Sequence, residues 1–298
     1  MSKNNWGWLV AVGATAVLGK TIINQWLAQQ KSQQIFQNKT AIVTGGASGI
    51  GQALCLKLAE RGALVIVADI NEVGATAVAR AINASYGQAR PAVLDVTDKT
   101  AVTNLVNQVA GEYGRLDYIF NNAGIGIYGY MQEVSQAAWE QMININLWGV
   151  IYGTQAAYEV MMRQGHGHIV NIASLAGLIP TPKGVPYGVA KHGVVGLSTS
   201  LRAEAEDHGV KVSVICPGFI DTPLFNRMEY HSHDPDTVMA AIRRVKLPSP
   251  ADCAEAALVG VAANQGIVTV APMAHLFWGI HRLNPAWLSP LLRRVTPD

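Results

Sequence analysis

Charged residues and cysteines are both scarce in this chain of 298 residues. Only 14% of the residues are charged, the formal net charge is +2, and there are three cysteines. So small a net charge argues against nucleic acid as a partner. Cys55, Cys216 and Cys253 are odd in number and lack the spacing of metal ligands. We therefore expect reduced thiols in a cytosol-facing protein, with no metal site and no disulfide framework.

Hydrophobic residues make up half of the chain, and short apolar runs alternate with stretches of helical periodicity. This alternation predicts an α/β fold: a Rossmann-type, doubly wound parallel sheet with helices on both faces. We expect a single catalytic domain over residues 36–269, with residues 225–250 as a lid over the substrate. Residues 1–35 would add an apolar helix and a polar linker, and residues 270–298 an apolar and basic extension.

The N-terminal segment carries no charge from Trp6 to Gly19, and beyond Lys20 it continues to Leu27. Residues 6–27 are long enough to cross a bilayer as a helix, with the lysine snorkelling, and they predict membrane association. Lysines after the segment outnumber the one before it, which would place the main domain in the cytoplasm or at the cytoplasmic face of a membrane. The alternative is an apolar helix that docks on its own domain or on a second subunit.

A β-branched run that ends at Gly45 is followed by a glycine-rich turn and then by a helical pattern. Glycines 49 and 51 leave the turn without side chains, so N–H groups at the helix start could face a pyrophosphate. The next strand ends at Asp69, where a carboxylate could bind an adenosine ribose and repel the 2′-phosphate of NADP. The pattern predicts NAD rather than NADP. Asp69 alone could equally be a helix N-cap or a solvated strand end.

Three side chains with proton-transfer chemistry lie close together in the sequence: Ser174, Tyr187 and Lys191. Tyr187 and Lys191 are four residues apart, so they share one face of a helix. A lysine there would lower the pKa of the phenol towards neutrality, which suits a proton-transfer group. For the pair alone, the alternative is an ordinary solvated helical face.

Two long helices are expected, from Gln136 to Met162 and from Tyr187 to His208. The first contains Asn146, a polar residue in apolar company. His166 and His168 lie two apart beside a buried strand, but no carboxylate or cysteine cluster accompanies them. We therefore expect both histidines to be surface turn residues and not metal ligands.

Taken together, these motifs resemble the classical short-chain dehydrogenase/reductase family from roughly residue 39 to residue 224. The segments TGGASGIG and NNAG occur in order with Asn146, Ser174, Tyr187 and Lys191. The resemblance implies that Tyr187 is the acid/base, Ser174 holds the substrate oxygen, Lys191 binds the nicotinamide ribose and Asn146 holds a water. It also implies a homodimer or homotetramer paired through the two long helices.

The same resemblance implies a set of cofactor-binding residues spread over the whole domain. These are Thr44, Gly45, Ser48, Gly49, Ile50, Gly51, Asp69, Asp95, Val96, Asn122, Ala123, Gly124, Tyr187, Lys191, Pro217, Gly218, Ile220 and Thr222.

The sequence thus predicts an NAD-dependent oxidoreductase that transfers a hydride between a secondary alcohol or ketone and the nicotinamide. An apolar lid and leader favour a lipophilic substrate such as a steroid, a retinoid or a long-chain alcohol. One alternative is an NADP-dependent ketone reductase on the same fold; another is a non-catalytic cofactor-sensing scaffold. The extension, with Trp278 and Trp287, could lie on a membrane, cover the cleft or form a dimer contact.

Overall fold

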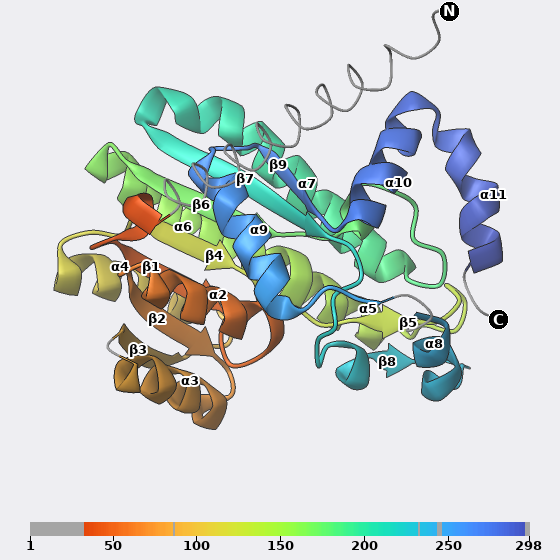
Figure 1. Cartoon of the computed structure of the whole chain (residues 1–298), viewed down its shortest axis with the longest axis horizontal. Helices are drawn as coiled ribbons and strands as arrows, with labels where there is room; N and C mark the ends of the chain where they lie inside the picture. The colour runs from red at the N-terminus through yellow and green to blue at the C-terminus, as the bar shows by residue number, and fades with distance from the viewer. Residues whose placement is uncertain (1–32, 86, 232, 243–245, 296–298) are drawn as a thin grey trace, which may run out of the picture.

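The computed structural model describes residues 33–85, 87–231, 233–242 and 246–295 (Figure 1). Its main feature is a parallel sheet of seven strands in the order β3-β2-β1-β4-β6-β7-β9. This order matches the Rossmann arrangement, in which the chain starts in the middle of the sheet and winds outward in both directions. The strands are β1 (Thr40–Thr44), β2 (Leu64–Asp69), β3 (Gln88–Val93), β4 (Tyr118–Asn121), β6 (Gly167–Ile172), β7 (Val210–Pro217) and β9 (Ile267–Val270).

Helices cover both faces of the sheet, as the sequence pattern predicted. On one face lie α2 (Gly49–Glu60), α3 (Glu72–Ala84) and α9 (Pro250–Ala262). On the other lie α4 (Lys99–Tyr113), α6 (Gly149–Gln164) and α7 (Val185–Ala205). Successive residues of a strand point to opposite faces of the sheet. In β1, Ala41 and Val43 pack against the first set of helices and Ile42 packs against the second. Because helices cover both faces of the sheet, the side chains on both faces of a central strand are buried. This explains why the strands are nearly continuous apolar runs in the sequence.

The structure differs from the sequence-based boundaries in several places. The third strand ends at Val93 and does not reach Asp95, and β9 is an additional strand that we did not predict. The helix expected from Gln136 to Met162 is interrupted: α5 (Gln136–Ile143) and α6 are joined by a π-helical turn, η1 (Asn144–Trp148). Such a turn depends on local hydrogen bonding that hydrophobic periodicity does not encode.

The prediction that His168 is a surface turn residue is wrong. His168 lies inside β6, between β4 and β7, and is only 4% exposed. Its Nε2 lies 2.8 Å from Ser213 Oγ, and burial lowers its pKa to about 3. His166, just before the strand, is exposed as expected. The two histidines therefore have opposite environments, which again argues against a shared metal ion.

Two smaller units lie beyond the sheet at the same end of the molecule (Figure 1). One is a pair of short parallel strands, β5 (Ile127–Tyr128) and β8 (Glu229–Tyr230), followed by α8 (Pro235–Ile242). The other is a hairpin of α10 (Pro272–Leu283) and α11 (Pro285–Val295), with α11 outermost. Short turns complete the chain: η2 (Leu175–Gly177), η3 (Glu206–His208) and η4 (Phe225–Arg227).

Within the described part of the chain, no helix is both long and apolar enough to cross a membrane. The apolar segment 6–27 lies outside the described residues. All three cysteines are buried free thiols, as expected from their scarcity.

Candidate active site

The predicted site residues gather where the parallel strands end. Thr44 ends β1, Asp69 ends β2, and Asn122 directly follows β4. Ser174 lies two residues after β6, and Pro217 ends β7. Because neighbouring parallel strands all end at one edge, segments far apart in the sequence meet there, at the point where the chain reverses direction between β1 and β4.

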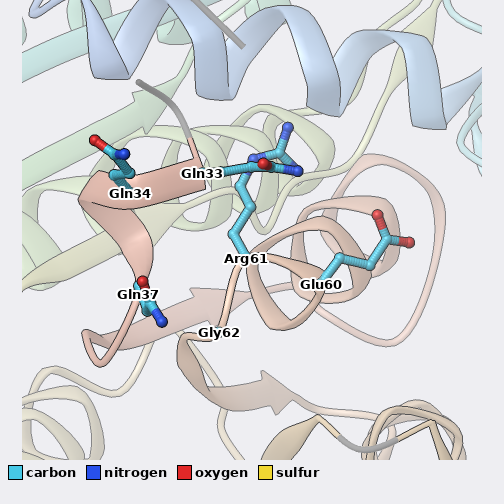
Figure 2. Close-up of a pocket in the computed structure, with 6 residues that line it drawn as sticks. All are labelled: Gln33, Gln34, Gln37, Glu60, Arg61 and Gly62. Carbon is cyan, nitrogen blue, oxygen red and sulfur yellow. The ribbon is translucent and has the colours of Figure 1, made fainter. Parts of the chain in front are cut away.

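A cavity of about 410 Å³ lies elsewhere and is not this site. Gln33, Gln34, Gln37, Glu60, Arg61 and Gly62 line it (Figure 2). Gln37 precedes β1 and Gly62 precedes β2, so the cavity lies at the opposite edge of the sheet. None of the predicted catalytic or cofactor-binding residues contributes to its lining.

The glycine-rich turn between β1 and α2 is shaped by close backbone contacts. A Cβ placed on Gly51 would lie 2.0 Å from the carbonyl oxygen of Gly45, which no side chain tolerates. Gly45 has a φ of +66°, and its Cβ would lie 2.9 Å from Ala123 Cα. No side chain caps the start of α2 at Ser48, so the first N–H groups of the helix remain available. This turn fits the pyrophosphate of a dinucleotide.

Thr44 and Asn122 hold the turn against the end of β4. Thr44 Oγ1 accepts hydrogen bonds from the backbone N–H groups of Asn122 (2.9 Å) and Ala123 (3.1 Å). Asn122 Nδ2 donates to the carbonyl oxygens of Thr44 (2.9 Å) and Gly45 (3.2 Å). The two side chains therefore position the glycine turn through contacts within the protein.

Asp69 is placed beside the same turn. Its Oδ2 accepts a hydrogen bond from the backbone N–H of Ala47, and its Oδ1 accepts one from Asn71, each at 2.9 Å. Asp95 is exposed and accepts bonds from the backbone N–H and the hydroxyl of Thr97. Val96 is buried. A carboxylate beside the turn and an apolar side chain next to the sheet edge fit the ribose and the adenine of a dinucleotide.

Asn146 sits in the π-helical turn and is fully buried. Its Oδ1 accepts from the backbone N–H of Ile125 (2.9 Å) and its Nδ2 donates to the carbonyl oxygen of Ile125 (2.8 Å). A Cβ on Gly124 would lie 2.6 Å from Asn146 Oδ1 and 3.7 Å from Lys191 Nζ. The π turn thus brings Asn146 to the loop after β4 and into the neighbourhood of the lysine.

Ser174, Tyr187 and Lys191 meet at the carboxyl end of β6. The Lys191 ammonium donates to the carbonyl oxygen of Ile172 at 2.9 Å and lies 5.6 Å from the centre of the Tyr187 ring. Burial lowers the pKa of Lys191 to about 8. Burial also raises the pKa of Tyr187, while a hydrogen bond with Ser174 lowers it to a smaller extent. The predicted lowering of the Tyr187 pKa by Lys191 is therefore wrong, because loss of hydration dominates at the phenol.

The loop after β7 closes the site on the remaining side. The N–H of Gly218 donates to the carbonyl oxygen of Val270 (3.1 Å), and the N–H of Asp221 donates to that of Pro248 (3.0 Å). Ile220 is buried, and Thr222 lies next to Gly49 at the start of α2. The loop therefore faces the glycine turn across the edge of the sheet.

Comparisons with known proteins agree with this arrangement. The family model described as short chain dehydrogenase matches residues 39–232. The chain belongs to the short-chain dehydrogenase family. It is an oxidoreductase that acts on CH–OH groups.

Two curated relatives are similar over most of their own length. The (2S)-[(R)-hydroxy(phenyl)methyl]succinyl-CoA dehydrogenase subunit BbsD of Thauera aromatica is 36% identical over 233 residues, which cover 78% of this chain and 93% of that protein. The 3-oxoacyl-[acyl-carrier-protein] reductase FabG of Thermotoga maritima is 31% identical over 233 residues, covering 78% of this chain and 94% of that protein. The two names describe different substrates, so the family alone does not give the substrate.

Two solved structures share the fold. A short-chain dehydrogenase/reductase from Burkholderia phymatum in complex with NAD superposes with a TM-score of 0.77 at 26% identity, covering 85% of this chain and 95% of that one. Levodione reductase superposes with a TM-score of 0.71 at 28% identity, covering 80% of this chain and 98% of that one.

Sequence reasoning missed two features of this short-chain dehydrogenase site, Cys216 and Lys183, and it left the position of the C-terminal extension open among three alternatives. Cys216 lies near Lys191. Burial raises the pKa of the Cys216 thiol to about 12, and the positive charge of Lys191 offsets part of that rise. Lys183 is buried, with its Nζ 4.7 Å from the centre of the Tyr130 ring. The α10–α11 hairpin packs on Leu175, directly after Ser174. Nothing in the local sequence signals these neighbours, because each comes from a distant segment or from an irregular loop.

Proposed function

We propose that this protein is an NAD-dependent oxidoreductase that interconverts a secondary alcohol and a ketone, with Tyr187 as the acid/base. The observation that carries the proposal is the meeting of Ser174, Tyr187 and Lys191 at the sheet edge that also holds the glycine turn. Tyr187 takes the hydroxyl proton during oxidation and returns it during reduction. Ser174 holds the substrate oxygen and stabilises the charge that develops on it.

Lys191 and Asn146 support the phenol from the protein side. The Lys191 ammonium binds the nicotinamide ribose and provides a positive charge beside Tyr187. Asn146 holds a water that links Lys191 to solvent. Asn146 lies in the π turn, and its side-chain amide contacts Gly124. A regular α-helix would direct this side chain elsewhere, so the π turn positions the amide.

A nicotinamide dinucleotide, when bound, supplies the hydride acceptor or donor. Asp69 binds the adenosine ribose, Asp95 and Val96 contact the adenine, and the first turn of α2 binds the pyrophosphate. NAD is preferred because a carboxylate at Asp69 repels a 2′-phosphate. The remaining members of the proposed binding set are Thr44, Gly45, Ser48, Gly49, Ile50, Gly51, Asn122, Ala123, Gly124, Tyr187, Lys191, Pro217, Gly218, Ile220 and Thr222.

We propose a lipophilic substrate such as a steroid, a retinoid or a long-chain alcohol. The segments beside Ser174 support this, because Leu175 and Ile179 are buried apolar side chains. In the proposed lid, residues 225–250, Phe225 and Met239 are also buried and apolar. Residues 6–27 would associate the enzyme with the cytoplasmic face of a membrane, where such substrates concentrate. The active form would be a homodimer or homotetramer.

Replacement of the phenol tests the mechanism. Tyr187→Phe removes the proton-transfer group and keeps the ring, so turnover should fall roughly 10²- to 10⁴-fold. NAD affinity, measured by fluorescence titration, should stay nearly unchanged. Tyr158→Phe is the matched control, since Tyr158 lies on α6 among residues of the sheet core. Retained turnover in Tyr187→Phe would refute the mechanism; loss of NAD binding in the same variant would mean that the variant does not test it.

A further inference from the structure

The α10–α11 hairpin exposes a row of large apolar side chains to solvent. We call Met273, Leu276, Leu283 and Trp287 the outer row. Their exposed fractions are 43%, 58%, 79% and 63%. Leu276 and Leu283 are seven residues apart on α10 and therefore share one helix face. Trp287 lies on α11, the other helix of the hairpin, and is exposed as well.

The opposite side of the hairpin is apolar as well, and it is buried. Ala274 and Leu288 are 0% exposed, and Phe277 and Trp278 pack with them. The cluster includes Leu175 and Ile179, in the loop that follows Ser174. Helix α10 is thus apolar around much of its circumference, because Ile280 of the inner cluster lies four residues after Leu276 of the outer row and the two apolar regions adjoin. The inner face packs on Leu175 and Ile179, whereas no described residue covers the outer row.

Charge on the hairpin has one sign. From residue 272 to residue 292 the chain contains one basic side chain that is charged at neutral pH, Arg282, and no carboxylate. Two more arginines follow at positions 293 and 294. The Arg282 guanidinium lies 5.1 Å from the centre of the Trp278 ring, so a cation lies beside the apolar rows. Apolar side chains with tryptophan and arginine at their margins, and no acidic residue, match the chemistry of an anionic lipid surface.

We propose that the outer row of the α10–α11 hairpin docks on the surface of an anionic lipid bilayer. A second copy of the chain fits this face less well, because a two-fold contact through the hairpin would bring the Arg282 guanidinium groups of both copies towards each other, and residues 272–292 contain no carboxylate to pair with them. The apolar leader in residues 6–27 provides a second membrane signal, and stable attachment generally takes two.

Docking in this orientation has a consequence for the substrate, which rests on the proposed lipophilic specificity. The inner face of the same hairpin contacts Leu175, next to the serine that holds the substrate oxygen. The hairpin is therefore one wall between the lipid and the catalytic residues. A membrane-dissolved alcohol could pass along this wall without crossing bulk water.

A fluorescent label on the outer row tests the docking without any measurement of turnover. The three native cysteines are all 0% exposed, so a new surface cysteine reacts selectively with a polarity-sensitive dye. Full-length Leu283→Cys carries the dye on the outer row. Val73→Cys, at a position 81% exposed on α3, is the matched control. Both are mixed with vesicles of phosphatidylcholine that contain phosphatidylglycerol, and with vesicles of phosphatidylcholine alone.

We expect the emission at position 283 to shift to the blue on anionic vesicles, less on neutral ones, and the emission at position 73 to stay unchanged. Adding Leu276→Gln to the labelled variant should weaken vesicle binding of the hairpin about tenfold or more, since burial of one leucine side chain contributes about 1.5 kcal/mol or more. An unchanged emission at position 283 would refute docking, even if the leader holds the protein on the vesicles. A blue shift that grows with protein concentration in the absence of vesicles would assign the face to a second copy and refute the proposal equally.

Discussion

At Tyr187, two effects on the phenol oppose each other. Burial raises its pKa, and the hydrogen bond with Ser174 offsets only part of that effect. The neighbouring Lys191 is also affected by burial, which lowers its pKa to about 8. The phenol is therefore protonated throughout the neutral range, and the ammonium begins to lose its proton just above it.

The raised pKa of Tyr187 and the lowered pKa of Lys191 predict different pH profiles for alcohol oxidation and for ketone reduction. Oxidation needs an ionised Tyr187, whose fraction grows with pH below a raised pKa, so kcat/KM for oxidation should rise from neutral to alkaline pH. Reduction needs the protonated phenol and the Lys191 ammonium, so its kcat/KM should be flat up to neutrality and fall as Lys191, with a pKa of about 8, loses its proton. Both are measured by NADH absorbance. An oxidation rate that is independent of pH over this range would contradict the assignment of Tyr187 as the base.

Asp69 is the residue on which cofactor choice should depend. Asp69→Asn keeps the size of the side chain and removes its charge, so we expect weaker NAD use and better NADP use. A hydrogen bond to a charged group contributes roughly 1.5–3 kcal/mol, which corresponds to a shift in preference of about 10- to 100-fold. Asp95→Asn is the control. It also removes a carboxylate, but one that we propose contacts the adenine and not the ribose that carries the 2′-phosphate of NADP. An unchanged ratio of the two kcat/KM values in Asp69→Asn would show that specificity lies elsewhere.

At the scale of elements, the pairing of β5 with β8 ties the proposed lid to the catalytic edge. The N–H of His231 donates to the carbonyl oxygen of Tyr128 (2.8 Å), and the N–H of Glu229 donates to that of Gly126 (3.2 Å). The Tyr128 ring also contacts His233, with ring centres 5.1 Å apart. Strand β5 follows the Asn122–Gly124 loop, so the lid is held beside the loop that contacts Asn146.

Removal of one of these backbone bonds should loosen the lid. His231→Pro deletes the N–H that donates to Tyr128, at a cost of about 1 kcal/mol, so KM for the alcohol should rise roughly fivefold. NAD affinity should change little, because His231 makes no described contact with the glycine turn and is not among the proposed cofactor-binding residues. His231→Ala serves as the control: it removes the imidazole beside Glu229 and keeps the backbone N–H. Equal KM values in the proline and alanine variants would show that the backbone bond does not hold the lid.

The sequence predicted the elements whose signals are local. The glycine turn, the strand that ends at Asp69 and the helix that carries Tyr187 and Lys191 each follow from residues close together in the chain. His168 was misplaced because its burial depends on β4 and β7, which flank β6 in the sheet and come from distant segments. The direction of the Tyr187 pKa was wrong for a similar reason: residue spacing shows the lysine but not the loss of hydration. The position of the α10–α11 hairpin is likewise set by contacts with Leu175 and Ile179, far away in sequence.

At the scale of the whole molecule, the outward faces of α6 and α7 suit contact with a second copy. On α7, Val189, His192 and Gly196 are exposed, and a Cβ on Gly196 would meet nothing within 4 Å. The glycine leaves room at this point of the helix face for another helix to approach closely. Directly before α6, Trp148 of the π-helical turn is 44% exposed and stacks on Tyr152, with ring centres 5.7 Å apart. These two helices are the ones through which we expect the subunits to pair.

The variant Gly196→Gln tests subunit pairing through α7 without destabilising the folded monomer. Since no described residue occupies the space beside Gly196, the larger side chain fits the monomer, and replacing a glycine inside a helix should stabilise it by up to about 1 kcal/mol. In a dimer paired through α7, the same side chain would occupy the space that the partner helix needs. We therefore expect a smaller mass in light scattering, together with an unchanged or increased stability to urea. Gly111→Gln on α4 is the matched control, because Gly111 is also exposed with no atom within 4 Å of an added Cβ, and it should leave the mass unchanged. If Gly196→Gln has the same mass as the parent protein, the subunits do not pair through α7.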